Sequence, residues 1–282
     1  MTYKLFVGDC LEVLQEIEDG SIDLIITSPP YNCRKDYGVI DDMWPWEEYY
    51  RWIKKVLKEL YRVLVVGGVI AINVPGVVRF QREHQYADTW GDYEAEYETH
   101  RVGKKIMGTG RIEAIGFEIF QMMKKIDNHM REPIIWVKGD KEQIISTTYQ
   151  MGSDNNPYLR ATHEMILLGS KGQWYHRGGT GRRGKEAMPF LDETKDTWYI
   201  KPESSRVHPA VFPIEIPRRL IKLFTHASDA VVLDPFMGIG TTGIAAMELG
   251  RAFIGIDLNE QFVQQAEDRL YQEIAQMKLW EE

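Results

Sequence analysis

The segment Ser28-Pro29-Pro30-Tyr31 combines a hydroxyl group, two rigid residues and an aromatic ring, one residue after the apolar run 24–26. Two successive prolines fix two φ angles and remove two N–H donors, and they push the preceding Ser28 into an extended conformation. Carbonyl and hydroxyl groups can then accept hydrogen bonds from a flat amine, while the Tyr31 ring stacks on it. Prolines also occur where a strand simply leaves a sheet, so this segment alone leaves a structural role open.

A second candidate lies near the C-terminus, where the apolar run 231–233 leads into the glycine-rich turn 234–243. Glycines let the backbone approach a ligand closely, and the start of the following helix offers free N–H groups. Asp257 ends the next predicted strand, where a carboxylate can accept hydrogen bonds from ribose hydroxyls. The order of strand, glycine turn, helix, strand and acid predicts a nucleoside-cofactor site.

The glycines at 238, 240 and 243 also match the G-x-G-x-x-G spacing of dinucleotide-binding proteins, which makes NAD an alternative ligand. A dinucleotide-binding fold normally begins with this unit. Here only one predicted helix, 259–276, follows Asp257, so the other strands of the sheet must come from upstream. The fold is then circularly permuted, and this position in the chain disfavours NAD.

Short apolar runs alternate with amphipathic stretches along the chain, which is typical of a parallel sheet covered by helices on both faces. The stretch 75–110 has no sustained period and is predicted as an excursion from the sheet, and the polar stretch 172–206 is predicted as a loop. Strands are predicted at 5–7, 24–26, 69–74, 133–138, 164–170, 230–234 and 252–257, and helices at 11–17, 46–64, 112–127, 214–225, 241–249 and 259–276.

Length and composition exclude several classes of protein. The 282 residues suffice for one or two domains with a full core, and two cysteines exclude a disulfide framework or an all-cysteine zinc site. The longest apolar run, 63–74, is too short to span a membrane, and the first ten residues do not resemble a signal peptide, so a cytoplasmic protein is expected. No metal is expected, because His163 and Glu164 have no third ligand at metal spacing.

The net charge of −8 by itself argues against a nucleic-acid partner. The charge is uneven, however, because the stretch 165–185 holds five Lys or Arg residues and no acid, whereas the stretch 86–98 holds five acids and no Lys or Arg. An acidic protein with such a separation can still bind DNA through one face.

Taken together, the motifs resemble those of the β-group amino-methyltransferases of restriction–modification systems. Residues 27–31 resemble the catalytic motif of that family, and residues 234–242 resemble its S-adenosylmethionine motif. Residues 208–213 resemble the segment that closes over the methionine end of the cofactor, and Gly8-Asp9 resembles the strand end beside its adenine. The catalytic motif precedes the cofactor motif, which is the β-group order and explains the permutation inferred above.

The resemblance implies a doubly wound, circularly permuted class I S-adenosylmethionine-dependent methyltransferase sheet with helices on both faces. It implies site-specific methyl transfer from S-adenosylmethionine to the exocyclic amine of a base flipped out of double-stranded DNA. The catalytic residues are then Ser28, Pro29, Pro30 and Tyr31, and the cofactor-binding residues are Asp9, Phe212, Asp234, Pro235, Phe236, Gly238, Gly240, Thr241, Thr242 and Asp257.

The sequence leaves alternatives for the target base and for the atom that is methylated. Within the family, Ser at position 28 is associated with N4 of cytosine and Asp with N6 of adenine, so cytosine is favoured. Adenine stays open as the target base, and RNA stays open as the substrate in place of DNA. Methylation of cytosine carbon-5 needs a cysteine nucleophile, for which only Cys33 lies near the motif. A binding module without catalysis is a further alternative. Trp44, Trp46 and Trp52 are predicted to be core residues rather than a base-stacking surface.

The chain is expected to form one catalytic domain. The resemblance also implies which molecules this domain binds. DNA recognition is expected in the basic loop, through Arg177, Arg182, Arg183 and Lys185. A homodimer and a cognate restriction endonuclease are further candidate partners. The predicted parts are a catalytic half at 1–74, an insertion at 75–110, further core strands at 111–171, a target-recognition loop at 172–206 and a cofactor-binding half at 207–282.

Overall fold

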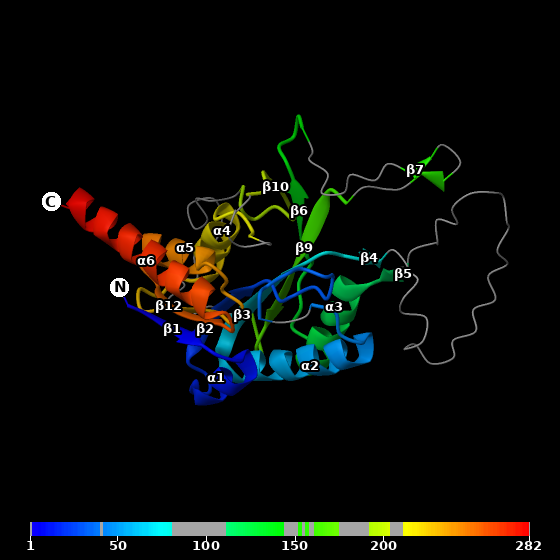
Figure 1. The fold of residues 1–282 in the computed structure, drawn as a ribbon. Coiled ribbons are helices and arrows are strands. Elements are labelled where there is room, and N and C mark those ends of the chain that lie inside the picture. The colour runs from blue at the N-terminus through cyan, green and yellow to red at the C-terminus, as the bar shows by residue number, and fades with distance from the viewer. Residues whose placement is uncertain are drawn as a thin grey trace.

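Strands and helices alternate along most of the chain in the computed structural model (Figure 1). The structure describes residues 2–39, 42–80, 111–143, 152–153, 156–157, 161–174, 192–203 and 211–281. The helices are α1 (Cys10–Glu16), α2 (Trp46–Val63), α3 (Ile115–Ile126), α4 (Glu215–Phe224), α5 (Thr241–Glu248) and α6 (Glu260–Glu281). The strands are β1 (Tyr3–Val7), β2 (Ile22–Thr27), β3 (Leu64–Val74), β4 (Val78–Phe80), β5 (Arg111–Glu113), β6 (Ile134–Lys138), β7 (Gly152–Ser153), β8 (Asn156–Pro157), β9 (His163–Ser170), β10 (Thr197–Ile200), β11 (Val231–Asp234) and β12 (Ala252–Asp257).

The main sheet has the strand order β1-β12-β11-β2-β3-β9-β6-β10. Strand β9 is antiparallel to both of its neighbours, β3 and β6, and every other pairing in this sheet is parallel. The first strands of the chain therefore lie beside its last strands, and the predicted permutation and doubly wound α/β fold are confirmed.

Helices cover both faces of this sheet (Figure 1). Helices α1, α2 and α3 pack on one face, and α4, α5 and α6 pack on the other. Strand β2 shows why its sequence is continuously apolar: Ile25 belongs to the core beneath α2, whereas Leu24 and Ile26 belong to the core beneath α4. A strand that is buried on both faces cannot alternate between apolar and polar residues.

Two segments differ from the sequence-based prediction. The stretch 172–206, predicted as a loop, contains β10, which pairs with the edge of β6 and buries Trp198. A strand of four residues, with Trp198 and Ile200 buried and Tyr199 exposed between them, is too short to show a period in sequence. Residues 112 and 113, predicted as the start of a helix, belong to β5, which pairs with β4. Among the described residues, no helix is long and apolar enough to cross a membrane.

The neighbouring strands β11 and β2 mark the point where the strand order reverses. From β11 the chain continues outward through β12, whereas from β2 it continues in the opposite direction through β3. Ligands of open α/β sheets bind in the crevice outside the carboxyl ends of strands at such a point. The two motifs 28–31 and 235–240 follow β2 and β11 directly, so the fold brings them together there.

Candidate functional site

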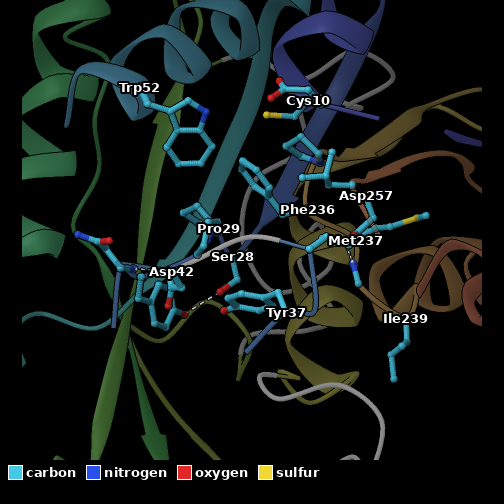
Figure 2. A pocket seen from close by; sticks show the side chains of 18 of the residues that line it. Cys10, Ser28, Pro29, Tyr37, Asp42, Trp52, Phe236, Met237, Ile239 and Asp257 are labelled. Carbon is cyan, nitrogen blue, oxygen red and sulfur yellow. Dashed lines mark hydrogen bonds between the residues drawn. The ribbon is translucent and has the colours of Figure 1, made fainter. Parts of the chain in front are cut away.

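One pocket at this sheet edge is lined by residues from both motifs (Figure 2). Figure 2 shows Ser28 and Pro29 on one side of Phe236 and Asp257 on the other. Of the predicted residues, the pocket wall contains Asp9, Ser28, Pro29, Pro30, Tyr31, Phe212, Pro235, Phe236, Gly238, Thr241 and Asp257. The structure thus joins the two halves of the predicted site in one cavity.

The Ser28–Tyr31 segment is held rigidly at the end of β2. The Ser28 Oγ and Tyr31 hydroxyl oxygens lie 2.7 Å apart and share a hydrogen bond. The Tyr49 hydroxyl of α2 donates to the Pro30 carbonyl at 2.8 Å, which ties the turn to the helix. The Ser28 hydroxyl is consequently oriented by Tyr31 while it lines the pocket.

Behind Tyr31 lies a polar network that the sequence-based prediction missed. The Asn73 side-chain amide donates to the Tyr31 hydroxyl at 2.9 Å and to Glu164 Oε2 at 2.6 Å. Lys138 Nζ donates to Glu164 Oε1 at 2.5 Å. A polar residue inside the apolar run 63–74 was the available signal for Asn73, because buried polar groups need partners.

The Tyr31 phenol is protonated in this environment. Burial raises the pKa of its hydroxyl well above the ordinary value, and the Glu164 carboxylate raises that pKa further. Tyr31 therefore acts as a neutral hydrogen-bond donor and acceptor at neutral pH, not as a phenolate.

Two carboxylates border the opposite part of the pocket. Asp9 accepts a hydrogen bond from the Leu11 backbone N–H at 2.7 Å and caps α1. Asp257 accepts from the backbone N–H groups of Gly238 and Asn259, both at 2.9 Å, and burial raises the pKa of its carboxyl. Each carboxylate oxygen can accept a second hydrogen bond, so Asp257 can also bind a hydroxyl group from the pocket.

Asp234, Gly240 and Thr242 belong to the predicted cofactor motif but are not among the residues of the pocket wall. Asp234 accepts hydrogen bonds from the hydroxyls of Thr27 at 2.8 Å and Thr242 at 2.7 Å and from the Phe236 N–H at 3.1 Å. Burial raises the pKa of Asp234 to about 6. These contacts indicate that Asp234 holds the two motifs together.

Aromatic side chains form a further wall of the pocket. Trp46 is buried in the core, as predicted, and Trp44 and Trp52 are partly buried and pack against the same core. Trp44 and Trp52 also line the pocket, which the sequence-based prediction did not foresee. Their ring centroids lie 5.2 Å apart in an edge-to-face arrangement, and Trp52 is 5.7 Å from Phe236. Trp44 and Trp52 therefore extend the apolar surface around Phe236, where a flat ligand can stack.

The loop after Tyr31 is organised by Asp42. The Asp42 carboxylate accepts hydrogen bonds from the backbone N–H groups of Asn32, Cys33 and Lys35.

Burial raises the pKa of the Cys33 thiol to about 12, and burial raises the pKa of the Cys10 thiol to about 12 as well. A thiol that stays protonated is a poor nucleophile, so the structure gives no support to carbon-5 chemistry.

The predicted DNA-binding residues Arg177, Arg182, Arg183 and Lys185 lie outside the described residues. Lys171, at the start of the basic stretch, is described. Its Nζ donates to the carbonyls of Arg62 at 2.8 Å and Leu64 at 2.7 Å, so it caps the end of α2. Within the described ranges, no group of three His, Cys, Asp or Glu side chains could hold a metal ion.

The pocket offers the kinds of contact that a nucleoside needs. Asp257 offers acceptors for ribose hydroxyls, Phe236 and Leu258 offer apolar surface, and Gly238 with φ 51° brings the backbone close. Ser28 and Tyr31 then lie at the other end of the same cavity, where a second flat group has hydrogen-bonding partners.

Comparisons with known proteins agree with this geometry. A model of the DNA methylase family matches residues 22–268. The type II methyltransferase M.BglII of Bacillus subtilis is 25% identical over 92% of this chain, which spans 66% of that relative, and M.SmaI of Serratia marcescens is 28% identical over 95% of this chain and 90% of its own length. M.BslI of Bacillus sp. is 28% identical, and the chain spans only 27% of its length.

Solved structures share the fold. The putative DNA modification methylase TTHA0409 of Thermus thermophilus, solved in complex with S-adenosyl-L-methionine, has a TM-score of 0.67 and 28% identity over 96% of this chain and 94% of its own. PvuII DNA methyltransferase, which is cytosine-N4-specific, has a TM-score of 0.68 and 18% identity over 95% of this chain and 86% of its own, a likeness that shows the fold alone.

Proposed function

The chain belongs to the DNA methylase family, and from that membership we propose that it transfers a methyl group from S-adenosylmethionine to the exocyclic amine of a base in double-stranded DNA, at N4 of cytosine. The observation that carries the proposal is the single pocket in which Ser28 and Tyr31 meet Phe236 and Asp257. A site for a nucleoside cofactor and a site for a flat amine are thereby adjacent.

The cofactor-binding end is assigned to the wall around Asp257. We assign the ribose hydroxyls to Asp257, the adenine to the region of Asp9 and Leu258, and the methionine end to Phe212 and Thr241. Bound there, S-adenosylmethionine supplies an electrophilic methyl group on a positively charged sulfur. The apolar surface of Phe236 and Pro29 excludes water between the two ends of the pocket.

The base-binding end supplies positioning and electrostatics. The lone pair of an exocyclic amine is delocalised into the ring, and hydrogen bonds from the amine to Ser28 Oγ and the Pro29 carbonyl would localise it on nitrogen. Tyr31 offers a ring against which a flipped base can stack. Rate enhancement then comes from orientation and charge stabilisation, without a covalent enzyme intermediate.

Ser28 is the residue that favours cytosine over adenine. A hydroxyl can accept from the amine of either base, so the preference rests on the resemblance of the motif. DNA recognition is proposed for Arg177, Arg182, Arg183 and Lys185 in the loop 172–206. These residues supply the positive charge that phosphate binding requires.

Transfer of tritiated methyl groups from S-adenosylmethionine to unmethylated DNA tests the activity. Ser28→Ala is the matched control, because it removes one hydroxyl at the base-binding end and none of the assigned cofactor contacts. Digestion of the product to nucleosides and mass analysis then identify the base. N4-methylcytosine supports the proposal, N6-methyladenine would correct the base, and cofactor binding without transfer would favour a binding module.

A further inference from the structure

Side chains from four adjacent strands of the sheet, or from the segments that follow them, form a continuous chain of hydrogen bonds. Ser28 and Tyr31 follow β2, and the bonds continue through Asn73 of β3, Glu164 of β9 and Lys138 of β6. Asn73 is 5% exposed, and the side chains of Glu164 and Lys138 are 13% and 11% exposed. The chain of bonds thus runs from the pocket into the protein interior.

The orientation of the Asn73 side chain in this network leaves one of its polar atoms without a hydrogen-bond partner among the described residues. Its amide nitrogen faces the Glu164 carboxylate and the Tyr31 hydroxyl, and its Oδ1 atom is buried without a hydrogen-bond partner among the described residues. Turning the amide over would place an oxygen against the Glu164 carboxylate, which is unfavourable. A buried acceptor without a partner is uncommon in folded proteins, so an orientation that leaves one calls for a reason.

The Tyr31 hydroxyl has one proton and three acceptors within reach. These are Ser28 Oγ at 2.7 Å, the Asn73 carbonyl at 3.2 Å and Glu164 Oε2 at 3.3 Å. If Tyr31 donates to Ser28, the Ser28 proton faces the pocket. If Tyr31 donates to the Asn73 carbonyl or the Glu164 carboxylate, Ser28 donates to Tyr31 and turns a lone pair toward the pocket.

The Glu164 charge favours the second arrangement, because a carboxylate attracts the phenol proton more strongly than a neutral hydroxyl does. Ser28 then presents an acceptor, which is the role that a target amine requires. During transfer the amine lone pair forms the N–C bond, the C–S electron pair stays on sulfur, and positive charge moves onto nitrogen, which afterwards loses one proton to water. An acceptor polarised by a remote carboxylate stabilises that charge.

We propose that Glu164, held by Lys138, is a positioning residue for methyl transfer that acts through Tyr31 to make Ser28 a hydrogen-bond acceptor for the target amine. This inference rests on the proposed function. Glu164 does not line the pocket, so its effect must pass through the Tyr31 hydroxyl.

A double-mutant cycle tests this dependence. Single-turnover methyl transfer, with cofactor and DNA saturating, is measured for Glu164→Gln, Tyr31→Phe and the double variant. In the parent chain, Glu164→Gln should slow transfer by about tenfold or more, with cofactor affinity unchanged. In the Tyr31→Phe background the same change should slow it by less than about twofold, because coupled residues act non-additively.

Tyr50 and Glu113 offer a matched control. The Tyr50 hydroxyl donates to Glu113 Oε1 at 2.9 Å, outside the residues of the pocket wall, so Glu113→Gln removes the same charge from a similar pair and should leave single-turnover transfer unchanged. Circular dichroism shows whether the Glu164→Gln variant is folded. If it is not, the variant that combines Glu164→Gln with Lys138→Gln takes its place in the cycle. This variant removes both charges together and so leaves no unpaired charge on a buried Lys138.

The outcomes are distinct. Equal slowing by Glu164→Gln in both backgrounds, or no slowing in the parent chain, overturns the inference while the parent activity stands. A parent chain that transfers no methyl group to DNA overturns the proposed function instead.

Discussion

Three aspartates near the two motifs have different roles although each follows or ends a strand. Asp9 caps α1, Asp234 ties the two motifs together outside the pocket wall, and Asp257 holds the glycine turn while facing the cavity. Their partners, rather than their residue type, separate a structural carboxylate from one that can bind ligand.

Asp257→Ala should weaken binding of S-adenosylmethionine by roughly 1.5–3 kcal/mol, because a charge-assisted pair of hydrogen bonds to the ribose is lost. Isothermal titration calorimetry on the parent and variant measures the change. Since Asp257 also accepts from Gly238, thermal unfolding without ligand serves as the control for damage to the turn. Unchanged affinity in a folded variant would show that the ribose binds elsewhere.

The raised pKa of Asp234 predicts a pH dependence of stability. Burial raises that pKa from 3.8 to about 6 in the folded state, so the folded protein binds more protons than the unfolded chain between these values. The Asp234 carboxyl therefore contributes most to the free energy of unfolding at the acidic end of this range. That contribution is lost as pH rises through about 6, and the loss is at most about 3 kcal/mol.

Asp234→Asn removes the titrating group. Between about pH 4 and about pH 6, the unfolding free energy of the parent should therefore fall relative to that of the Asn variant. Urea unfolding at a series of pH values measures it. A difference independent of pH would mean that the three hydrogen bonds to Asp234 keep the pKa of its carboxyl near its ordinary value.

At the scale of elements, the start of α5 depends on one glycine. Gly240 has φ 79°, and a Cβ there would lie 2.8 Å from the Cβ of Ala266 in α6. The glycine therefore serves both a left-handed conformation and the close contact of α5 with α6. Its role in this structure is helix packing, which positions the Phe236–Gly238 turn above.

Gly240→Ala should cost roughly 2–4 kcal/mol of unfolding free energy, from backbone strain and from overlap with Ala266. Gly250→Ala is the matched control, because Gly250 has φ 69° but its Cβ would meet nothing within 4 Å. That variant should lose only about 1–2 kcal/mol, from strain alone. Urea denaturation compares the two, and equal losses would argue against the packing role.

At the scale of the whole molecule, the uneven charge predicts how an acidic protein binds DNA. Replacing Arg177, Arg182 and Arg183 together by Ala should flatten the dependence of log affinity on log salt by about three units if each meets a phosphate. Lys171→Ala is the control, because Lys171 caps α2 and should change stability without changing the salt slope. Binding to duplex DNA is titrated at several salt concentrations.

A triple variant with the affinity, salt slope and sequence preference of the parent would place recognition elsewhere, with the stretch 101–111 as the next candidate. A lost base-edge contact would instead relax sequence preference by about 1–3 kcal/mol. The two readouts separate phosphate contacts from base contacts.

Local sequence patterns were enough to predict the fold class and the two motifs that meet in the pocket. Buried strands are apolar on both faces, and glycine or proline turns follow them, so local pattern sufficed for β2, β11 and the segments 28–31 and 235–240. The strand β10 was not predicted because it has only four residues, and its two buried side chains, Trp198 and Ile200, are too few to define a period.

Which side chains of these segments face the cavity depends on contacts between distant parts of the chain. Asp234 and Asp257 both end strands, yet only contacts across the sheet place one outside the pocket wall and the other in it. Asn73, Glu164 and Lys138 come from strands that are neighbours in space and distant in sequence. Strand order is set by long-range pairing, so no local pattern could have assembled their network behind Tyr31.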